Sequence, residues 1–496
     1  MDDAYIDMYY FFVPNRIVWD NFKYFMGEVE GTPWMPTKEY KVPAIKIKGT
    51  NSSKAPHTGT ILDYMGVPTK CVAGNGELDI NALPIRGYVK IWNEFFRDQN
   101  VDNAAALKTD DNDVTYSTGS GGTENAPLNT RLINARYGGF CLPVNKFHDY
   151  FTSCLPYPQR GPEVNLPMTG NAPLRLGNSN GTTIESLETG NGPEMVLGQT
   201  QTGNKPGSLV YTGNASNKMM QFTGVKDGET GAGGYMFADL SEVNAATIND
   251  LRQAVAVQHY YEAMARGGSR YREQVRSIYG VTISDKTVQV PEYLGGGRYH
   301  INMNQIVQTS AANKETNTPL GETGAVSITP INEASFTKSF EEHGFVIGVM
   351  CVRHDRSYQQ GLERFWSRKD RLDYYVPQFA NLGEQPVKKR EIMATGEATD
   401  EETFGYQEAW ADYRYKPNRV SGKMRSNANG TLDFWHYADN YNTVPTLSQE
   451  WMKEGKSEIA RTLIVQDEPQ FFGAIRVENK TTRPMPLYSV PGLDRI

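Results

Sequence analysis

Apolar residues along this chain gather in short runs that are separated by long polar stretches. Tyr5–Val13 is rich in aromatic and branched residues and stops at Pro14, which predicts a β-strand that ends where a backbone donor is missing. Phe345–Val352 is apolar almost throughout and predicts a strand buried on both faces. Three shorter runs near the C-terminus predict further strands: Leu463–Val465, Phe471–Val477 and Tyr488–Val490.

Helical spacing appears in three places between these runs. Gly87–Asp98 carries apolar residues at i, i+3, i+4, i+7 and i+8, which form one stripe. Ala245–Arg266 follows a polar entry, carries a second stripe and stops at two glycines. Tyr358–Ser367 carries a third stripe. Core packing, rather than cofactor binding, is the expected role of all three stripes.

The composition changes between Gly161 and Phe237, where Gly, Asn, Thr and Pro dominate and no periodicity persists. Structureless connections of more than about 15 residues are uncommon and are usually functional. We therefore expect residues 1–160 and 238–496 to build one domain, with 161–237 as a surface insertion. A linker between two domains is the alternative. Lys108–Thr130, which contains three aspartates, predicts a second surface loop.

Charge and cysteine content limit the partners of the chain. Its 496 residues carry a formal net charge of −7, so the overall field repels nucleic acid and any DNA contact must be a local basic patch. The four cysteines form no CxxC pair, and the first residues do not resemble a secretory leader. Since no apolar run reaches the length of a membrane span, we expect a protein made in a reducing cytoplasm without membrane insertion.

Residues that could do chemistry are scattered. His343 and His354 flank one predicted strand, but a zinc site needs three or four ligands. The acidic run from Asp110 to Asp113 lacks the Gly and the twelfth-position Glu of a calcium loop. Gly295–Gly297 has no helix after it and predicts a turn rather than a phosphate-binding loop. No catalytic residue, cofactor or metal site is expected.

Two segments interleave aromatic rings with cations, a composition that suits single-stranded DNA because rings stack on bases and cations neutralise phosphates. The first lies within Gly405–Ser426, and its candidate DNA contacts are Tyr413, Arg414, Tyr415, Lys416, Arg419, Lys423 and Arg425. The second combines Phe365 and Trp366 with the candidates Arg364, Arg368, Lys369 and Arg371. Lys388–Arg390 forms a third, smaller cluster. Charged surface faces and salt bridges between subunits explain the three clusters equally well.

Several phrases of the chain resemble one protein family in the same order. They are FFVPNRIVWDNF (Phe11–Phe22), LPYPQRGP (Leu155–Pro162), TINDLRQA (Thr247–Ala254), PEYLGGG (Pro291–Gly297), YQQGLERFWSR (Tyr358–Arg368), FANLGEQPV (Phe379–Val387), GYQEAWADYRYKPNRVSGKMRS (Gly405–Ser426) and TRPMPLYSVPGL (Thr482–Leu493). This set resembles the major capsid proteins of the small single-stranded DNA phages, the Microviridae, and most closely their gokushovirus branch.

The resemblance implies a mainly β fold, an eight-stranded antiparallel viral jelly roll with long loop and helical insertions. Sixty copies would form a T=1 icosahedral shell around a circular single-stranded DNA genome. The insertion at 161–237 would project beside the threefold axis and serve in attachment to a host receptor. Internal scaffolding and pilot proteins would be further partners, and the virion would assemble in the bacterial cytoplasm.

Two other classes of protein use jelly-roll scaffolds. A carbohydrate-binding module would expose an aromatic platform, for which Trp19, Trp34 and Trp435 are the candidates. A glycoside-cleaving enzyme needs two facing carboxylates, but Glu341 and Glu342 are adjacent and would point to opposite faces of a strand. Family members generally carry an N-terminal segment before the part that resembles MDDAYIDMYYFFVPNR, and this segment supplies an early barrel strand. We therefore expect either an internal Met start or a shortened barrel that lacks an edge strand or borrows one.

Overall fold

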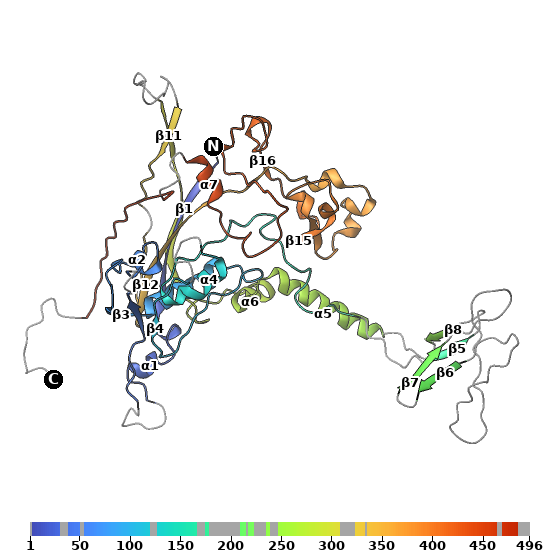
Figure 1. The fold of residues 1–496 in the computed structure, drawn as a ribbon, viewed down its shortest axis with the longest axis horizontal. Coiled ribbons are helices and arrows are strands. Elements are labelled where there is room, and N and C mark those ends of the chain that lie inside the picture. The colour runs from blue at the N-terminus through green and yellow to red at the C-terminus, as the bar shows by residue number, and fades with distance from the viewer. Residues whose placement is uncertain are drawn as a thin grey trace, which may run out of the picture. The chain divides into compact units, whose positions relative to one another are not determined.

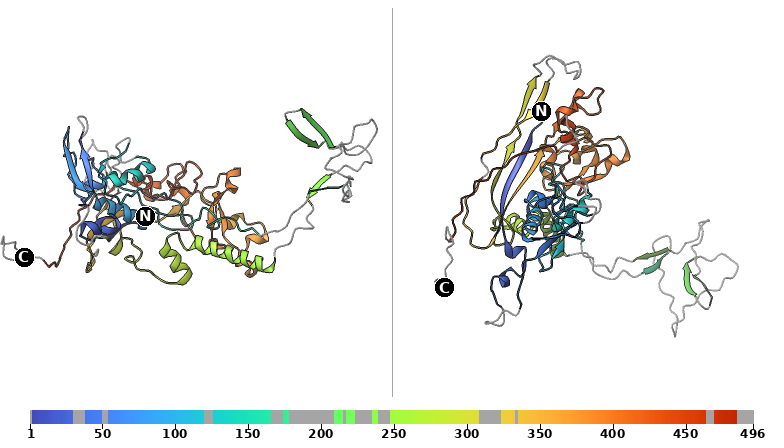
Figure 2. Two further views of the ribbon diagram at one scale, coloured as in Figure 1. Left: turned by 90° about the horizontal axis from the view of Figure 1, so that it is seen from below. Right: turned by 60° about the vertical axis from the view of Figure 1, so that its left-hand side comes forward.

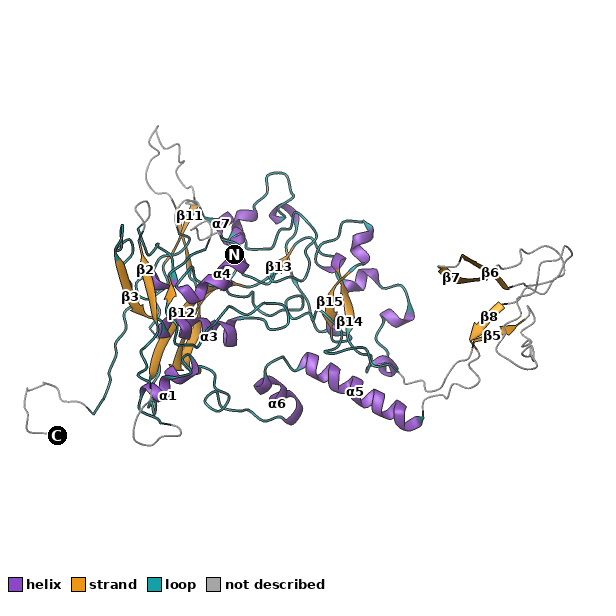
Figure 3. Ribbon diagram, turned by 60° about the horizontal axis from the view of Figure 1, so that its bottom comes forward, coloured by secondary structure: helices purple, strands orange, loops and turns teal. Residues whose placement is uncertain are grey.

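The computed structural model describes residues 2–29, 38–49, 54–119, 126–165, 174–177, 209–214, 217–222, 235–238, 247–307, 323–332, 335–463 and 469–484. These residues form two compact units. The first unit comprises 1–160 together with 263–496, and the second comprises 161–262. Most of the sheets are small and the helices are few, so the fold is rich in β-structure, with long loops between its elements (Figure 3).

A three-stranded antiparallel sheet is built on the N-terminal strand of the first unit. Strand β1 (Ala4–Pro14) lies between β12 (Gly344–His354) and β9 (Glu292–His300), and Figure 1 and Figure 2 show β1 and β12 running side by side. Phe11 faces Ile347 across the β1–β12 ladder. The two strands predicted at Tyr5–Val13 and Phe345–Val352 are therefore confirmed.

The burial predicted for the second of these strands is wrong. Ile347 is buried, but Val346 is 46% exposed and Met350 is 55% exposed, so β12 has one inner and one outer face. The outer face is covered only in part, where Phe336 packs on Tyr10 with ring centroids 5.4 Å apart. The apolar run predicted that both faces of the strand are buried. In the structure the inner face of this sheet packs on the core and most of its outer face stays exposed.

The glycine run Gly295–Gly297 lies inside strand β9 and does not form the predicted turn. The register of the β1–β9 ladder shifts between Tyr10 and Phe11, which marks a β-bulge. Gly296 has φ +142°, and a Cβ on it would overlap the carbonyl oxygen of Met8. The backbone of β9 next to the bulge therefore requires glycine at position 296.

Helix α3 (Leu83–Ile91) confirms the helix predicted at Gly87–Asp98, although it starts earlier and continues as a five-residue π turn at Trp92–Phe96. Its stripe packs on two cores. Val89 and Trp92 face one core, and Leu83 and Ile91 face the core beneath β1 and β12. Gly87 allows this close packing, because a Cβ there would lie 2.8 Å from Ile347 Cδ1.

A second sheet pairs β2 (Ala44–Lys48) with β3 (Glu77–Asn81) and β4 (Val114–Thr115). Helices α2 (Ile61–Tyr64) and α4 (Leu128–Asn134) pack in the same core as β2, whereas α1 (Phe22–Phe25) packs on the core beneath β1 and β12. The surface loop predicted at Lys108–Thr130 thus contains a strand and the start of a helix. Its aspartates anchor the structure: Asp111 accepts hydrogen bonds from Trp19 Nε1 at 2.7 Å and from Asn21 at 2.8 Å.

The helix predicted at Tyr358–Ser367 is wrong. Strand β13 (Ser357–Tyr358) pairs in parallel with β16 (Asn418–Arg419), and only a 3-10 turn forms at Arg364–Ser367. The buried Tyr358 hydroxyl donates to Asp149 at 2.6 Å, and the Gln360 side chain donates to the Tyr441 carbonyl at 2.8 Å. These distant contacts outweigh the local helical pattern. Strands β14 (Gln385–Lys388) and β15 (Thr403–Gln407) form the adjacent sheet.

Helix α5 (Ile248–Arg266) confirms the helix predicted at Ala245–Arg266, and α6 (Tyr271–Tyr279) follows it. The prediction that the apolar stripe of α5 packs in a core is wrong for the isolated chain. Ile248 is 71% exposed, and Leu251 and Val255 are also exposed. Such an unpaired apolar stripe is typical of a contact surface.

The remaining strands are short. In the first unit β10 (Met303–Val307) pairs with β11 (Thr323–Ser327), and helix α7 (Ser457–Thr462) lies near the C-terminus. Phe471–Val477 is extended but joins no ladder among the described residues, so the strand predicted there is wrong. Of the other two predicted C-terminal strands, only Leu463 falls within the described residues.

The second unit contains two small antiparallel pairs. Strand β5 (Leu174–Gly177) pairs with β8 (Tyr235–Ala238), and β6 (Leu209–Asn214) pairs with β7 (Asn217–Phe222). The segment 161–237 therefore contains regular structure that its composition did not predict. No helix in the described ranges is long and apolar enough to cross a membrane.

Candidate nucleic-acid and assembly surfaces

The two predicted aromatic and basic segments lie side by side, although about 50 residues separate them in the sequence. The parallel pairing of Tyr358 with Arg419 brings them together. They line one cavity of about 270 Å³, to which the first segment contributes Tyr413, Tyr415 and Lys416 and the second contributes Arg364, Phe365 and Arg368. The sequence predicted two separate sites, and the structure joins them into one.

Aromatic stacking fixes this cavity. The rings of Tyr415 and Tyr150 are stacked, with centroids 4.9 Å apart and planes inclined by 10°. The Arg368 guanidinium lies 4.1 Å from the centroid of the Tyr413 ring, which is a cation–π contact. Burial raises the pKa of Tyr415 and of Tyr150, so both phenols remain protonated at neutral pH.

Most of the candidate cations already have carboxylate partners within the chain. Arg414 pairs with Glu408 at 2.8 Å, and both Lys416 and Arg419 pair with Glu363. Arg368 pairs with Asp412, and Arg364 lies 4.0 Å from Glu391. These partners offset the positive charge on which a phosphate contact at the cavity would depend.

Three candidates differ from the rest. No salt bridge reaches Lys369, Arg371 or Lys423 from any residue that the structure describes, and all three are exposed. Arg425 instead donates to the Gln359 carbonyl at 3.1 Å and so holds a loop in place. In the third cluster, Lys389 pairs with Glu402 at 2.6 Å and Arg390 pairs with Glu401, which favours an internal structural role for it.

Exposed apolar residues flank Lys369 and Arg371 in the sequence. Trp366 is 65% exposed, and several apolar neighbours are also exposed. We call this set the aromatic–basic surface; it consists of Phe365, Trp366, Lys369, Arg371, Leu372, Tyr374, Tyr375 and Tyr413. A soluble monomer rarely exposes so many large apolar side chains in one region, so the surface favours a binding role.

The ends of the predicted insertion lie in the second unit. Gly161 contacts the ring of Tyr261 in α5, since a Cβ on this glycine would lie 3.3 Å away from it. Phe237 pairs with Arg175 in the ladder of β5 and β8. Both positions therefore belong to the second compact unit.

Sequence reasoning missed a set of buried ion pairs. Asp7 is fully buried and pairs with Arg298 at 3.0 Å and with Arg353. The sequence did contain a signal for these ion pairs, because Asp7 is a carboxylate among the inward-facing residues of an apolar strand. A buried charge needs a partner of opposite charge. A second network joins Arg356 to Asp439 and Glu454. The Arg356 guanidinium and the Lys146 ammonium lower the pKa of Asp439 to about 2 against the effect of its burial.

The other candidate sites have structural explanations. His343 and His354 lie at opposite ends of the 11-residue strand β12, and His354 contacts Glu454 at 2.5 Å. Glu341 pairs with Lys286, and Glu342 pairs with Arg16. Trp19 is fully buried, so it cannot belong to an exposed carbohydrate platform, and Trp34 lies outside the described residues.

Comparison with known proteins identifies the family. Residues 1–493 match the capsid protein (F protein) family. The chain is 38% identical to the capsid protein VP1 of Spiroplasma virus 4, an alignment that covers 100% of this chain and 87% of that protein. It is 36% identical to the capsid protein VP1 of Chlamydia phage 1, with 100% and 88% covered, and 37% identical to that of Bdellovibrio phage phiMH2K, with 99% and 86% covered. The chain therefore belongs to the capsid protein (F protein) family and is a capsid protein of the Microviridae.

Proposed function

We propose that sixty copies of this chain form a T=1 icosahedral shell around a circular single-stranded DNA genome, as in the gokushovirus branch. The match to the capsid protein family over residues 1–493 is the observation that carries this proposal. The exposed stripe of α5 and the open face of β12 supply apolar area of the kind that subunit contacts bury. The role is structural, without catalysis, a cofactor or a metal ion.

An eight-stranded jelly roll is the proposed architecture of the subunit in the shell. The antiparallel sheet β12–β1–β9 would supply strands of one layer. Residues 1–160 and 238–496 would share this barrel, and 161–237 would be the insertion.

Size-exclusion chromatography followed by negative-stain imaging tests the shell proposal. We expect uniform particles in the void volume. A chain that stays monomeric and binds an oligosaccharide would instead support a carbohydrate-binding module. Turnover of a glycoside by such a monomer would support an enzyme. Only the first outcome agrees with a shell protein.

The aromatic–basic surface and its cavity are the proposed contact with the packaged DNA. Rings on which bases can stack lie beside the cations Lys369 and Arg371, which no described salt bridge neutralises. The candidates Arg414, Lys416 and Arg419 belong to the same site, where phosphate would compete with Glu408 and Glu363. Internal scaffolding and pilot proteins would assist assembly in the bacterial cytoplasm.

The insertion is the proposed site of attachment to a host receptor. It lies within the second compact unit, 161–262, and contains the small sheets of that unit, so it can vary without changing the packing of the first unit. Deletion of residues 161–237 should abolish adsorption to the host and leave particle assembly intact. An infectious phage that carries the deletion would contradict this role.

A further inference from the structure

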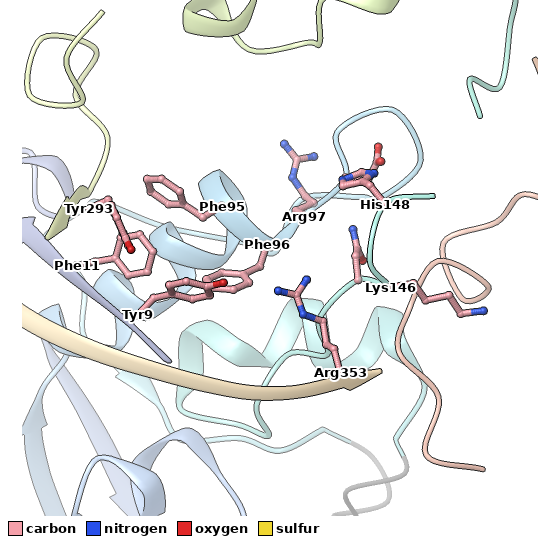
Figure 4. A pocket seen from close by; sticks show the side chains of 11 residues that line it. Tyr9, Phe11, Phe95, Phe96, Arg97, Lys146, His148, Tyr293 and Arg353 are labelled. Carbon is pink, nitrogen blue, oxygen red and sulfur yellow. The ribbon is translucent and has the colours of Figure 1, made fainter. Parts of the chain in front are cut away.

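A second cavity, also of about 270 Å³, lies beneath strand β1 and has a different character (Figure 4). Its floor is aromatic and consists of Tyr9, Phe11, Phe95, Phe96 and Tyr293. The rings touch one another: Phe11 and Phe95 have centroids 4.6 Å apart, and Phe11 and Tyr293 5.7 Å apart. The π turn that ends α3 contributes two consecutive aromatic residues to this floor. Such turns often occur at functional sites.

The charge of the lining distinguishes this cavity from the one at Tyr413. The lining contains three cations, Arg97, Lys146 and Arg353, and the single carboxylate of Asp98. Lys146 pairs with Asp439 and Arg353 pairs with Asp7, whereas no described salt bridge reaches Arg97. The Asp98 carboxylate already accepts a hydrogen bond from the backbone N–H of Asn100 at 2.8 Å. The cavity at Tyr413 has three cations against three carboxylates. Each cation of the cavity at Tyr413 has one of these carboxylates within 4.0 Å, so the cavity beneath β1 is the one that leaves a cation for an anion.

Arg97 is the cation best placed to receive that anion. Its side chain donates to the carbonyl oxygens of Asp102 at 3.1 Å and Asn93 at 3.5 Å, and no salt bridge reaches it from the part of the chain that the structure describes. Burial, and then the nearby Arg270, lower the pKa of Arg97, and the carboxylates of Glu94, Asp102 and Asp98 oppose this shift without forming a described salt bridge to it. A phosphate would supply the missing negative charge.

Arg353 adds further positive charge. It shares the buried Asp7 with Arg298, so two guanidinium groups are balanced by one carboxylate. The two guanidinium groups lie 4.2 Å and 3.7 Å from the centroid of the Phe147 ring. An aromatic floor with an excess of cations around it matches the two parts of a nucleotide, the flat base and the phosphate.

We propose that this cavity binds one unpaired nucleotide of a DNA strand, with the base against the aromatic floor and the phosphate beside Arg97. The proposal rests on the proposed DNA cargo of the shell and adds a site separate from the aromatic–basic surface. A duplex cannot use the cavity, because its bases are stacked and paired. The occupant is therefore single-stranded.

Fluorescence anisotropy of the full chain with a labelled oligothymidylate tests the site. The double variant Arg97→Gln with Tyr293→Leu should bind the oligomer about tenfold or more weakly, since both the stacking and one phosphate contact are lost. Tyr293→Phe and Arg97→Lys should keep most of the affinity, because they keep the ring and the charge. Unchanged melting temperatures exclude a folding defect, and a destabilised Tyr293→Leu variant is replaced by Arg97→Gln alone.

Further measurements distinguish a nucleotide site from a simple anion site and from the aromatic–basic surface. Displacement of the oligomer by thymidine monophosphate supports a nucleotide site, whereas equal displacement by inorganic phosphate overturns it in favour of a simple anion site. Photo-crosslinking with bromodeoxyuridine oligomers should label Tyr9, Phe96 or Tyr293, and labelling confined to Tyr413 overturns the proposal.

The double variants separate the two proposed sites. If Lys369→Gln with Arg371→Gln abolishes binding while Arg97→Gln with Tyr293→Leu does not, the cavity is excluded as a DNA site and the aromatic–basic surface remains the proposed DNA contact. If the wild-type chain binds no oligomer and its particles hold no DNA, both proposals fail.

Discussion

Arg356 donates a hydrogen bond to Asp439 across 2.8 Å, and both side chains are almost fully buried. Arg356 lies between strands β12 and β13, whereas Asp439 lies in the loop that precedes α7. Asp439 also accepts from Lys146 at 3.3 Å and from the Tyr441 hydroxyl at 2.6 Å. This carboxylate therefore joins three parts of the chain that are far apart in sequence.

Asp439→Asn should lower the free energy of unfolding by about 3–5 kcal/mol, because Arg356 and Lys146 would be buried without their counter-charge. Urea denaturation of the wild type and the variant measures the difference. Glu401→Gln is the matched control, since Glu401 pairs with Arg390 but is 63% exposed. Its cost should stay below about 1 kcal/mol. Equal costs for the two variants would contradict the structural role of the buried network.

Stability should also fall in acid through Asp439. The pKa of this carboxyl is about 2 in the folded chain and near 3.8 in its ordinary state. Its contribution of about 2 kcal/mol is therefore complete above pH 3.8 and is lost as the pH falls toward 2. Unfolding free energies measured between pH 2 and 4 should show a steeper slope in the wild type than in Asp439→Asn. Parallel slopes would refute the assignment.

Gly296→Ala should destabilise the chain by about 3 kcal/mol or more, because a Cβ there is strained by the positive φ and overlaps the Met8 carbonyl. Gly27→Ala is the control, since Gly27 also has a positive φ but no atom lies near its would-be Cβ. It should cost about 1–2 kcal/mol. Thermal denaturation of both variants provides the comparison. Equal losses of stability in the two variants would contradict the requirement for glycine at position 296.

Packaging should depend more on the cations without described partners than on the paired ones. Lys369→Gln with Arg371→Gln should increase the ratio of empty to full particles several-fold, because two phosphate contacts are lost. Arg414→Gln with Lys416→Gln should have a smaller effect, since Glu408 and Glu363 already offset these charges. Sedimentation of the particles gives the ratio. Unchanged packaging in both double variants, with normal shells, would remove this surface from the DNA contact.

The elements that the sequence predicted well are those with strong local patterns. Tyr5–Val13 became β1, and the stripe from Tyr88 to Phe96 became α3 and its π turn. Long-range contacts decided the failures. The segment after Tyr358 has a helical stripe, but Gln360 and Tyr358 are held by Tyr441 and Asp149. No local pattern reveals such partners.

The candidate site was predictable in composition but not in arrangement. The sequence identified Tyr413, Lys416, Arg364 and Arg368 as members of two clusters, and the pairing of β13 with β16 makes them neighbours. The sequence could not show that Glu363 and Asp412 would neutralise them. The cavity at Arg97 was missed as well, because its residues come from five separate stretches of the chain.

The mass and image of particles assembled from the chain test the central claim most directly. Sixty copies of a 55.5 kDa chain give a closed shell with about 3.3 MDa of protein. We expect mass photometry and electron microscopy to show uniform icosahedral particles of this protein mass, with single-stranded DNA inside those recovered from infected cells. A monodisperse single chain, under conditions in which intact virions persist, would contradict the account.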